Sequence, residues 1–283
     1  MNERKHSKEK PLQKRLPCLH SQNRFHYWPC VLILFLSPAF AAERATPDPD
    51  ATLKDALVHA RHSVNSFWGQ FRSVTCVEKV TQEKLGKQGR IEHAQKATFD
   101  YLALMSVEQS GLSVEESRLE QGKAGKAKNV PMLITNGVPT LLLVFHPFYR
   151  ESFRYELDGS PSPEGQVKIH FAHIAGTRST AAVRLRGKDY PLEIQGTAWL
   201  DSATGFIHRI VAEIAAPMGD INLKSVQMAV NYAPMTFPAG NDPYWLPLTA
   251  DIDIQTARQH WHNVHQYSNY KRFTVNTEDK VLR

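Results

Sequence analysis

The strongest constraint on the fold is a β-hairpin signal in residues 196–216. Two segments rich in apolar residues, Thr-Ala-Trp-Leu and Phe-Ile-His-Arg-Ile-Val-Ala-Glu-Ile, flank a five-residue loop that runs from Asp201 to Gly205. Aspartate is favoured at the first position of a type I turn, and glycine accepts the left-handed conformation that ends such a loop. Residues 196–216 therefore predict a tight antiparallel hairpin.

The rest of the chain repeats this plan of strands and turns. Residues 71–85 and 90–107 are β-rich segments joined by a Gly-Lys-Gln-Gly turn, and Leu248, Ala250, Ile252 and Ile254 alternate with polar residues. Residues 176–191 are expected to form a polar connection. These patterns predict a mainly β (α+β) protein with a large curved antiparallel sheet, or incomplete β-barrel, of about ten strands.

Two segments favour helices. Residues 52–69 carry apolar side chains at helical spacing after a capping pattern at Thr52, which predicts an N-terminal helix with one face on the sheet. Residues 141–145 are all apolar and lie between Pro139 and Pro147. Because proline is tolerated in the first turn of a helix, this second segment predicts a short helix of about two turns. A helix that is apolar on every side must be covered by protein, so we expect it on the concave side of the sheet.

The first 41 residues have the order of a secretory signal peptide. Seven Lys/Arg residues against two acidic ones precede a short apolar segment, residues 31–36, and an Ala-Phe-Ala site follows. We expect cleavage between Ala41 and Ala42, a periplasmic protein with no stable transmembrane segment, and one remaining cysteine, Cys76, buried in a strand. The formal net charge of +6 is concentrated in this leader, so the body is nearly neutral and no nucleic-acid partner is expected.

Several short segments together resemble a known group of proteins. They are Ala198-Trp-Leu-Asp, Thr204-Gly205, Tyr244-Trp-Leu-Pro247 and Tyr267-Ser-Asn-Tyr270-Lys-Arg-Phe273. This pattern resembles uncharacterised exported bacterial proteins that share the LolA-like fold of outer-membrane lipoprotein sorting, over roughly residues 50–280. The resemblance implies one half-barrel domain over residues 42–283, whose concave side, partly covered by helices, holds acyl chains.

We therefore expect a non-enzymatic periplasmic protein that binds an apolar ligand, a lipid or a lipoprotein acyl chain, inside the half-barrel. The expected ligand-binding residues are apolar side chains of the covering segment, of the hairpin and of two later strands: Leu142, Val144, Phe145, Trp199, Val226, Met228, Val230, Ile252 and Ile254. An alternative is an envelope protein–protein interaction module with a filled core, in which the partner is another envelope protein.

No common catalytic or nucleotide-binding motif occurs in the sequence, and no cofactor is expected. One cluster of histidines could instead bind a metal ion. His260 and His262 project to the same side of a strand, and a third ligand could come from His265, His170 or His173. Because a chain with 13 histidines forms such clusters readily, we expect these imidazoles to be ordinary polar groups and predict no metal site.

Overall fold

The computed structural model describes residues 49–108, 111–122, 137–160, 162–185, 188–238 and 242–273. The predicted signal peptide and its cleavage site lie outside these residues. In order along the chain, the elements are α1 (Pro49–Phe71), β1 (Val74–Leu85), η1 (Lys87–Gly89), β2 (Ile91–Glu108), β3 (Gly111–Glu120), η2 (Val138–Phe145), η3 (Pro147–Tyr149), β4 (Phe153–Asp158), β5 (Gln166–His173), β6 (Ala182–Leu185), β7 (Lys188–Pro191), β8 (Ile194–Asp201), β9 (Ile207–Ile214), η4 (Gly219–Ile221), β10 (Leu223–Met235), β11 (Tyr244–Thr256) and β12 (His260–Arg272).

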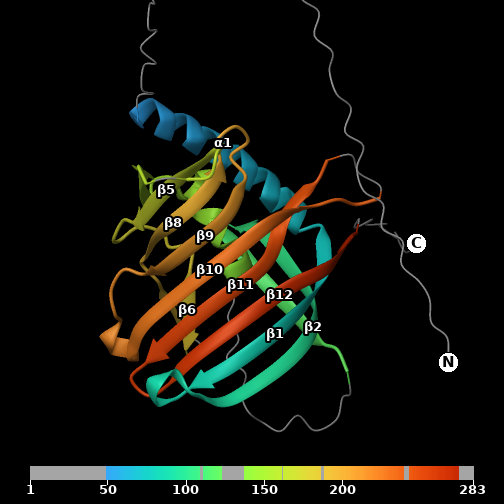
Figure 1. Cartoon of the computed structure of the whole chain (residues 1–283), viewed down its shortest axis with the longest axis vertical. Helices are drawn as coiled ribbons and strands as arrows, with labels where there is room; N and C mark the ends of the chain where they lie inside the picture. The colour runs from blue at the N-terminus through green and yellow to red at the C-terminus, as the bar shows by residue number, and fades with distance from the viewer. Residues whose placement is uncertain are drawn as a thin grey trace, which may run out of the picture. The chain divides into compact units, whose positions relative to one another are not determined.

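Ten of the strands form one antiparallel sheet, in the order β3-β2-β1-β12-β11-β10-β9-β8-β5-β4. The sheet curves, and η2 lies on its concave side (Figure 1). Among the described strands, β3 and β4 form the two edges and do not pair with each other, so the barrel is not closed. The predicted fold class, a mainly β chain with an incomplete barrel and an N-terminal helix, is confirmed.

The hairpin that constrained the prediction joins β8 to β9. Asp201 Oδ1 accepts hydrogen bonds from the backbone N–H groups of Ala203 and Thr204, at 3.1 and 2.7 Å. Gly205 has φ +70°, the left-handed conformation that glycine allows. A Cβ atom on Gly205 would lie 2.2 Å from the carbonyl carbon of His59 in α1. The loop therefore packs directly against the backbone of the helix.

Helix α1 extends beyond the predicted residues 52–69 at both ends. Its buried face includes Ala60, Val64 and Phe67, as the spacing predicted, and it contacts β11, β4 and η2 (Figure 1). Gly69 does not end the helix. Trp68 and Phe71 are both buried against the core, and their burial outweighs the cost of about 1 kcal/mol for a glycine inside a helix.

Two other predictions are corrected by strand pairing. Residues 176–191 contain a separate hairpin, β6–β7, in place of an irregular connection. On β11, Leu248 does not share a face with Ala250 and Ile252. The register shifts there, because Asn231 pairs with Thr249 and Tyr232 with Pro247. Leu248 occupies the extra position of this β-bulge and is 42% exposed.

Within the described ranges, no helix has both the length and the apolar character needed to cross a membrane.

Candidate functional site: the covered concave face

Strands β10 and β11 bring most of the predicted apolar residues together. Val226, Met228 and Val230 alternate with more exposed residues on β10, and all three are buried. Met228 lies opposite Ile252, and Val226 lies opposite Ile254, which is partly buried against the same core. Because directly opposed residues of neighbouring strands share a face, these five side chains form one continuous apolar surface.

The segment η2 covers this surface. It is a 3₁₀ helix in which all eight residues are buried, and it contacts α1, β9, β10 and β11. Leu142, Val144 and Phe145 are 2%, 0% and 1% exposed. The sequence predicted a short apolar helix on the concave side, and the structure places one there. The segment η2 therefore fills the space next to the apolar strands.

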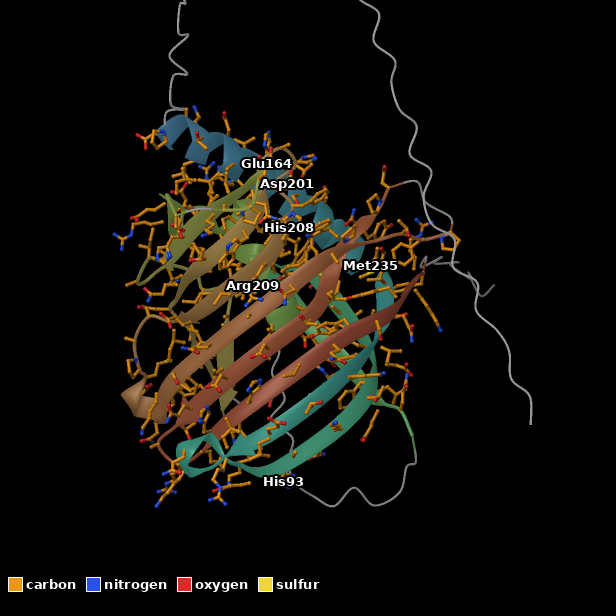
Figure 2. All side chains as sticks on the ribbon, viewed as in Figure 1. His93, Glu164, Asp201, His208, Arg209 and Met235 are labelled. Atoms are coloured by element: carbon orange, nitrogen blue, oxygen red, sulfur yellow. The ribbon has the colours of Figure 1, made fainter. Side chains whose placement is uncertain are left out.

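Trp199 lies on the opposite face, contrary to the prediction. Its neighbours Ala198 and Leu200 are completely buried, whereas Trp199 is partly exposed and is paired with Lys168 and Arg209. Arg209 is visible among the polar side chains of the sheet's outer face in Figure 2. Successive residues of a strand point to opposite faces, so the burial of Ala198 and Leu200 places Trp199 outside.

Two tyrosines, the buried Tyr232 and the partly buried Tyr155, hydrogen-bond the backbone of η2 to the sheet. The hydroxyl group of Tyr232 on β10 donates to Pro139 O at 3.1 Å and accepts from Leu142 N at 3.4 Å. The hydroxyl group of Tyr155 on β4 donates to Val144 O at 2.6 Å. Since a short 3₁₀ helix leaves backbone groups unpaired at its ends, these phenols satisfy polar groups that would otherwise be buried alone.

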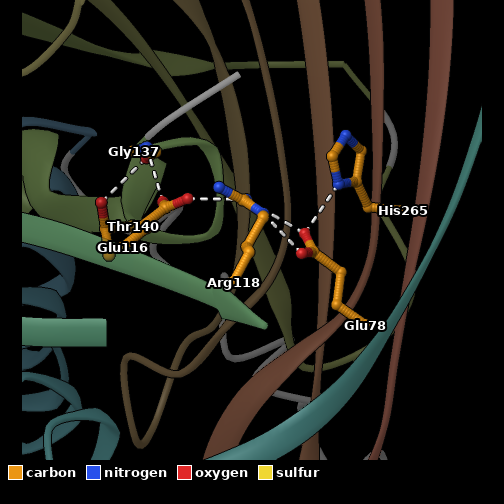
Figure 3. Close-up of polar contacts among 6 residues, drawn as sticks. All are labelled: Glu78, Glu116, Arg118, Gly137, Thr140 and His265. Atoms are coloured by element: carbon orange, nitrogen blue, oxygen red, sulfur yellow. Dashed lines mark hydrogen bonds and ion pairs between the residues drawn. The ribbon is translucent and has the colours of Figure 1, made fainter. Parts of the chain in front are cut away.

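A chain of charged side chains continues from the N-terminal end of η2 across the concave face (Figure 3). The backbone N–H of Gly137 donates to Glu116 Oε1 at 2.6 Å, and Glu116 Oε2 lies 2.7 Å from Arg118 Nη2. Arg118 donates to both carboxylate oxygens of Glu78, at 2.6 and 3.1 Å. His265 Nδ1 lies 2.8 Å from Glu78 Oε1. We call Glu116, Arg118, Glu78 and His265 the ionic chain.

The ionic chain joins strands that are distant in sequence, β3, β1 and β12. Its two carboxyl groups have pKa values displaced in opposite directions. Burial would raise the pKa of Glu78, but hydrogen bonds from His265 and Arg118 outweigh it, and the net shift is downward. For Glu116, burial raises the pKa more than Arg118 and the Gly137 N–H lower it. Glu78 is thus the preferred anion beside Arg118.

Sequence reasoning missed the ionic chain as a site. Two signals were available in the sequence. Glu78 shares the face of a strand with Val74 and Cys76, and Glu116 and Arg118 are two residues apart. A charged residue at an inward position predicts a buried partner, but alternation does not say which one.

The chemistry of the ionic chain favours a structural role. Both members of the imidazole–carboxylate pair, His265 and Glu78, are almost completely buried, whereas acid–base catalysis requires contact with a substrate. Cys76 lies next to Glu78 on the inward face of β1, where burial raises the pKa of its thiol to about 12. It is therefore a neutral thiol at physiological pH and a poor nucleophile.

The histidine cluster is divided between the two faces of β12. His260 Nε2 lies 2.7 Å from Asp253 Oδ2, and His262 Nε2 lies 3.2 Å from Asp251 Oδ2. His265 points inward to Glu78 instead. His170 and His173 belong to β5, and β11, β10, β9 and β8 lie between that strand and β12. Over the described residues, no three His, Cys, Asp or Glu side chains are grouped in a way that could hold a metal ion.

Comparison with known proteins gives fold-level likenesses only. No family model and no curated protein matches the chain. A solved DUF1329 family protein from Desulfovibrio piger is similar with a TM-score of 0.41 and 10% identity, over 83% of this chain and 95% of that one. A putative outer membrane lipoprotein-sorting protein domain from Vibrio parahaemolyticus is similar with a TM-score of 0.40 and 9% identity, over 82% and 96%.

The second of these proteins is described by the same lipoprotein-sorting role as the group that the sequence pattern resembles. At such TM-scores and identities, the likeness carries no conclusion about function.

Proposed function

We propose that the protein is a non-enzymatic, periplasmic binding protein that holds an apolar ligand, a lipid or a lipoprotein acyl chain, on the concave face of its open sheet. The observation that carries this proposal is η2, a fully buried segment that is apolar apart from Thr140 and covers the apolar surface of β10 and β11. We propose that η2 is a removable cover and that Leu142, Val144 and Phe145 line the ligand site together with Val226, Met228, Val230, Ile252 and Ile254.

The energetics of such an exchange depend on what covers each apolar surface. If an alkyl chain enters between η2 and the strands, the apolar surface of Met228 and Ile252 stays buried, so the hydrophobic contribution of about 25 cal/mol per Å² of that surface is retained. The apolar side chains of η2 must pack against the same alkyl chain, because exposing one large apolar side chain to water costs about 1.5–3 kcal/mol. The polar contacts that hold η2, from Tyr232, Tyr155 and Glu116, are lost at about 1 kcal/mol for each neutral hydrogen bond and about 1.5–3 kcal/mol for the bond to the Glu116 carboxylate.

The test weakens these contacts without removing the core. Tyr155→Phe and Tyr232→Phe each delete a hydroxyl group bonded to η2 and keep the aromatic ring. Tyr270→Phe is the matched control, because its hydroxyl group donates to Pro247 O of β11 at 2.6 Å. The measurement is stopped-flow fluorescence of a neutral naphthylamine lipid probe as it enters the protein.

We expect Tyr155→Phe and Tyr232→Phe each to raise the rate of probe entry about fivefold, which corresponds to about 1 kcal/mol less stabilisation of the closed state. Tyr270→Phe should leave the rate unchanged while lowering the free energy of unfolding by a similar amount. Failure of the wild-type protein to bind the probe, or equal rates in all three variants, would contradict the carrier function.

A second candidate, the interaction module with a filled core, is favoured by another observation. The β2–β3 hairpin at the edge of the sheet exposes Leu104, Val107 and Leu119, which are 52%, 72% and 70% accessible. Exposed apolar residues on a hairpin at the edge of a sheet are suited to contact with another protein. Native mass spectrometry after gentle purification separates the two functions, because a carrier co-purifies with lipid and an interaction module does not.

A further inference from the structure

Two buried tyrosine hydroxyl groups next to the ionic chain have no hydrogen-bond partner among the described residues. They belong to Tyr101 on β2 and Tyr267 on β12, and each of these residues is 2% exposed. A polar group buried without a partner lowers stability, so the hydroxyl group of a buried tyrosine usually bonds to protein, water or a ligand. The two hydroxyl groups therefore mark a place where a further polar group can bind.

The two rings lie together and against the ionic chain. Their centroids are 5.6 Å apart. Tyr101 lies opposite Arg118 of β3, and the guanidinium carbon of Arg118 is 5.1 Å from the centroid of the Tyr101 ring. Tyr267 lies opposite Glu78 of β1. Strand pairing and ring contacts thus bring both tyrosines to the same part of the buried face as the charged side chains.

Both hydroxyl groups also interact with the carboxyl groups of the ionic chain. Burial raises the pKa of Tyr101 and Tyr267 well above 10, and the charges of Glu78 and Glu116 raise it further. Each phenol therefore stays uncharged and can both donate and accept a hydrogen bond. Glu116 extends this group to the N-terminal end of η2, where its carboxylate accepts from Gly137 N at 2.6 Å (Figure 3).

Movement of η2 determines which ligand group fits beside these residues. It removes the Gly137 N–H from Glu116, so a ligand group at this point must donate a hydrogen bond to the carboxylate. The same group can accept from Tyr101 or Tyr267. A cation would be repelled by Arg118, which lies 2.7 Å from Glu116, and an anion would be repelled by the two carboxyl groups. An uncharged group with both donor and acceptor atoms meets these requirements.

We infer that Glu116, Tyr101 and Tyr267 form a polar subsite that binds the uncharged headgroup of an amphiphile through a hydroxyl or carboxamide group. The alkyl chain would then lie on the apolar surface of β10 and β11, because β11 is the neighbour of β12 in the sheet. The inference rests on the proposed function, since η2 must move to admit the ligand, and it names the class of ligand. Bound water is the competing occupant of the two tyrosine hydroxyl groups.

The experiment measures binding of probes with the same chain length by calorimetry, below the concentrations at which they aggregate. The probe 1-lauroylglycerol supplies hydroxyl groups, and dodecanamide supplies a carboxamide. Methyl dodecanoate has acceptor atoms but no donor, dodecanoate is an anion and dodecylammonium is a cation. The variants are Tyr101→Phe and Tyr267→Phe. Tyr270→Phe is the matched control, because its hydroxyl group already donates to Pro247 O at 2.6 Å.

We expect the wild-type protein to bind 1-lauroylglycerol or dodecanamide at least fivefold more tightly than methyl dodecanoate and either ion. The ratio between the two preferred probes identifies the headgroup as hydroxyl or carboxamide. Tyr101→Phe and Tyr267→Phe should each weaken binding of the preferred probe about fivefold, whereas Tyr270→Phe should not change it.

Stability of the ligand-free protein provides a second readout. Tyr101→Phe and Tyr267→Phe should keep or raise the urea midpoint, because they remove a hydroxyl group that has no partner. Tyr270→Phe should lower the midpoint, because it removes a hydrogen bond. A variant that is at least as stable as the wild type but binds the ligand more weakly distinguishes a ligand contact from a structural role.

Three results would overturn the inference. They are equal binding of methyl dodecanoate and the two hydrogen-bonding probes, unchanged binding in both Tyr101→Phe and Tyr267→Phe, and urea midpoints lowered in these variants as much as in Tyr270→Phe. The last result would show that bound water already satisfies the hydroxyl groups. If the naphthylamine probe enters the protein but the headgroup preference is missing, only the polar subsite is wrong. If that probe does not enter the wild-type protein, η2 is not a cover and both proposals fail.

Discussion

The guanidinium group of Arg118 contacts two buried carboxyl groups, those of Glu78 and Glu116, whose pKa values are shifted in opposite directions. Arg118 contacts both, yet Glu78 receives two hydrogen bonds from it and a third contact from His265, whereas Glu116 receives one ion pair and a backbone N–H. The pKa of Glu78 falls and that of Glu116 rises. Glu78 therefore contributes stability that is present above its unfolded-state pKa and is lost as the pH falls through its folded-state pKa.

Replacing Glu78 with Gln should reveal this contribution. At pH 7 we expect Glu78→Gln to lower the free energy of unfolding by about 3–5 kcal/mol, because Arg118 keeps a buried charge with a weakened partner. Below the ordinary Glu pKa of 4.5, the carboxyl group of Glu78 is protonated first in the unfolded chain and then, at the lower pKa of the folded state, in the native protein, so the difference between the two proteins should shrink as the pH falls. Urea unfolding at pH 7 and about pH 3 measures both values.

Glu83→Gln is the control for that comparison, since Glu83 lies on β1 but on the face opposite Gln82, which is buried. It should change the unfolding free energy by about 0.5 kcal/mol or less at pH 7. A Glu78→Gln penalty that is the same at both pH values would show that the ionic chain does not depend on the charge of Glu78.

At the scale of elements, α1, the β8–β9 hairpin and η2 hold one another in place. The hairpin loop touches the backbone of α1 at Gly205, and His59 Nδ1 in α1 lies 3.1 Å from Ser202 O in the same loop. Helix α1 in turn contacts η2. The geometry of one five-residue loop thus helps to set the position of the helix over the concave face.

Replacing Gly205 with Ala tests this contact. Alanine at φ +70° is strained, and its Cβ would lie 2.2 Å from His59 C, so backbone must move. Gly89→Ala is the matched control: Gly89 has φ +72° and nothing within 4 Å of the added atom. We expect Gly89→Ala to lower the unfolding free energy by about 1–2 kcal/mol and Gly205→Ala by a further 1–3 kcal/mol or so. Equal losses in denaturant unfolding would mean that the loop does not position α1.

At the scale of the whole molecule, the proposed carrier function depends on where the protein is located. The leader pattern in residues 1–41 predicts export. Exposed apolar side chains at Leu104 and Val107, on the strand next to the edge strand β3, are compatible with ligand or partner exchange in the envelope.

We predict that the exported protein begins at Ala42 or one residue later, because Ala39 and Ala41 occupy the small-residue positions of the cleavage site. N-terminal sequencing of protein from the periplasmic fraction checks this. Ala41→Leu should abolish processing at that bond, whereas Ser37→Ala, which keeps a small residue before the site, should not. Recovery of the exported protein with Met1 retained would contradict the prediction.

Much of the fold was predictable because it depends on local patterns. The hairpin at Asp201 and Gly205 follows from turn chemistry, and the alternation of Val226, Met228 and Val230 follows from the two-residue period of a strand. Helix α1 and the apolar segment η2 were predictable for the same reason. Each is encoded within about 20 consecutive residues, where spacing and flanking proline or glycine select the conformation.

The rest was decided by the tertiary structure. Leu248 changes face because of a bulge set by pairing between β10 and β11, and Trp199 faces outward because its neighbours fill the core. Glu78 is 40 residues from Arg118 and 187 residues from His265 in the sequence. The alternation of residues along a strand predicts the face of the sheet on which each side chain lies, but not the residue that it contacts. Only the order and register of the strands bring these charges together.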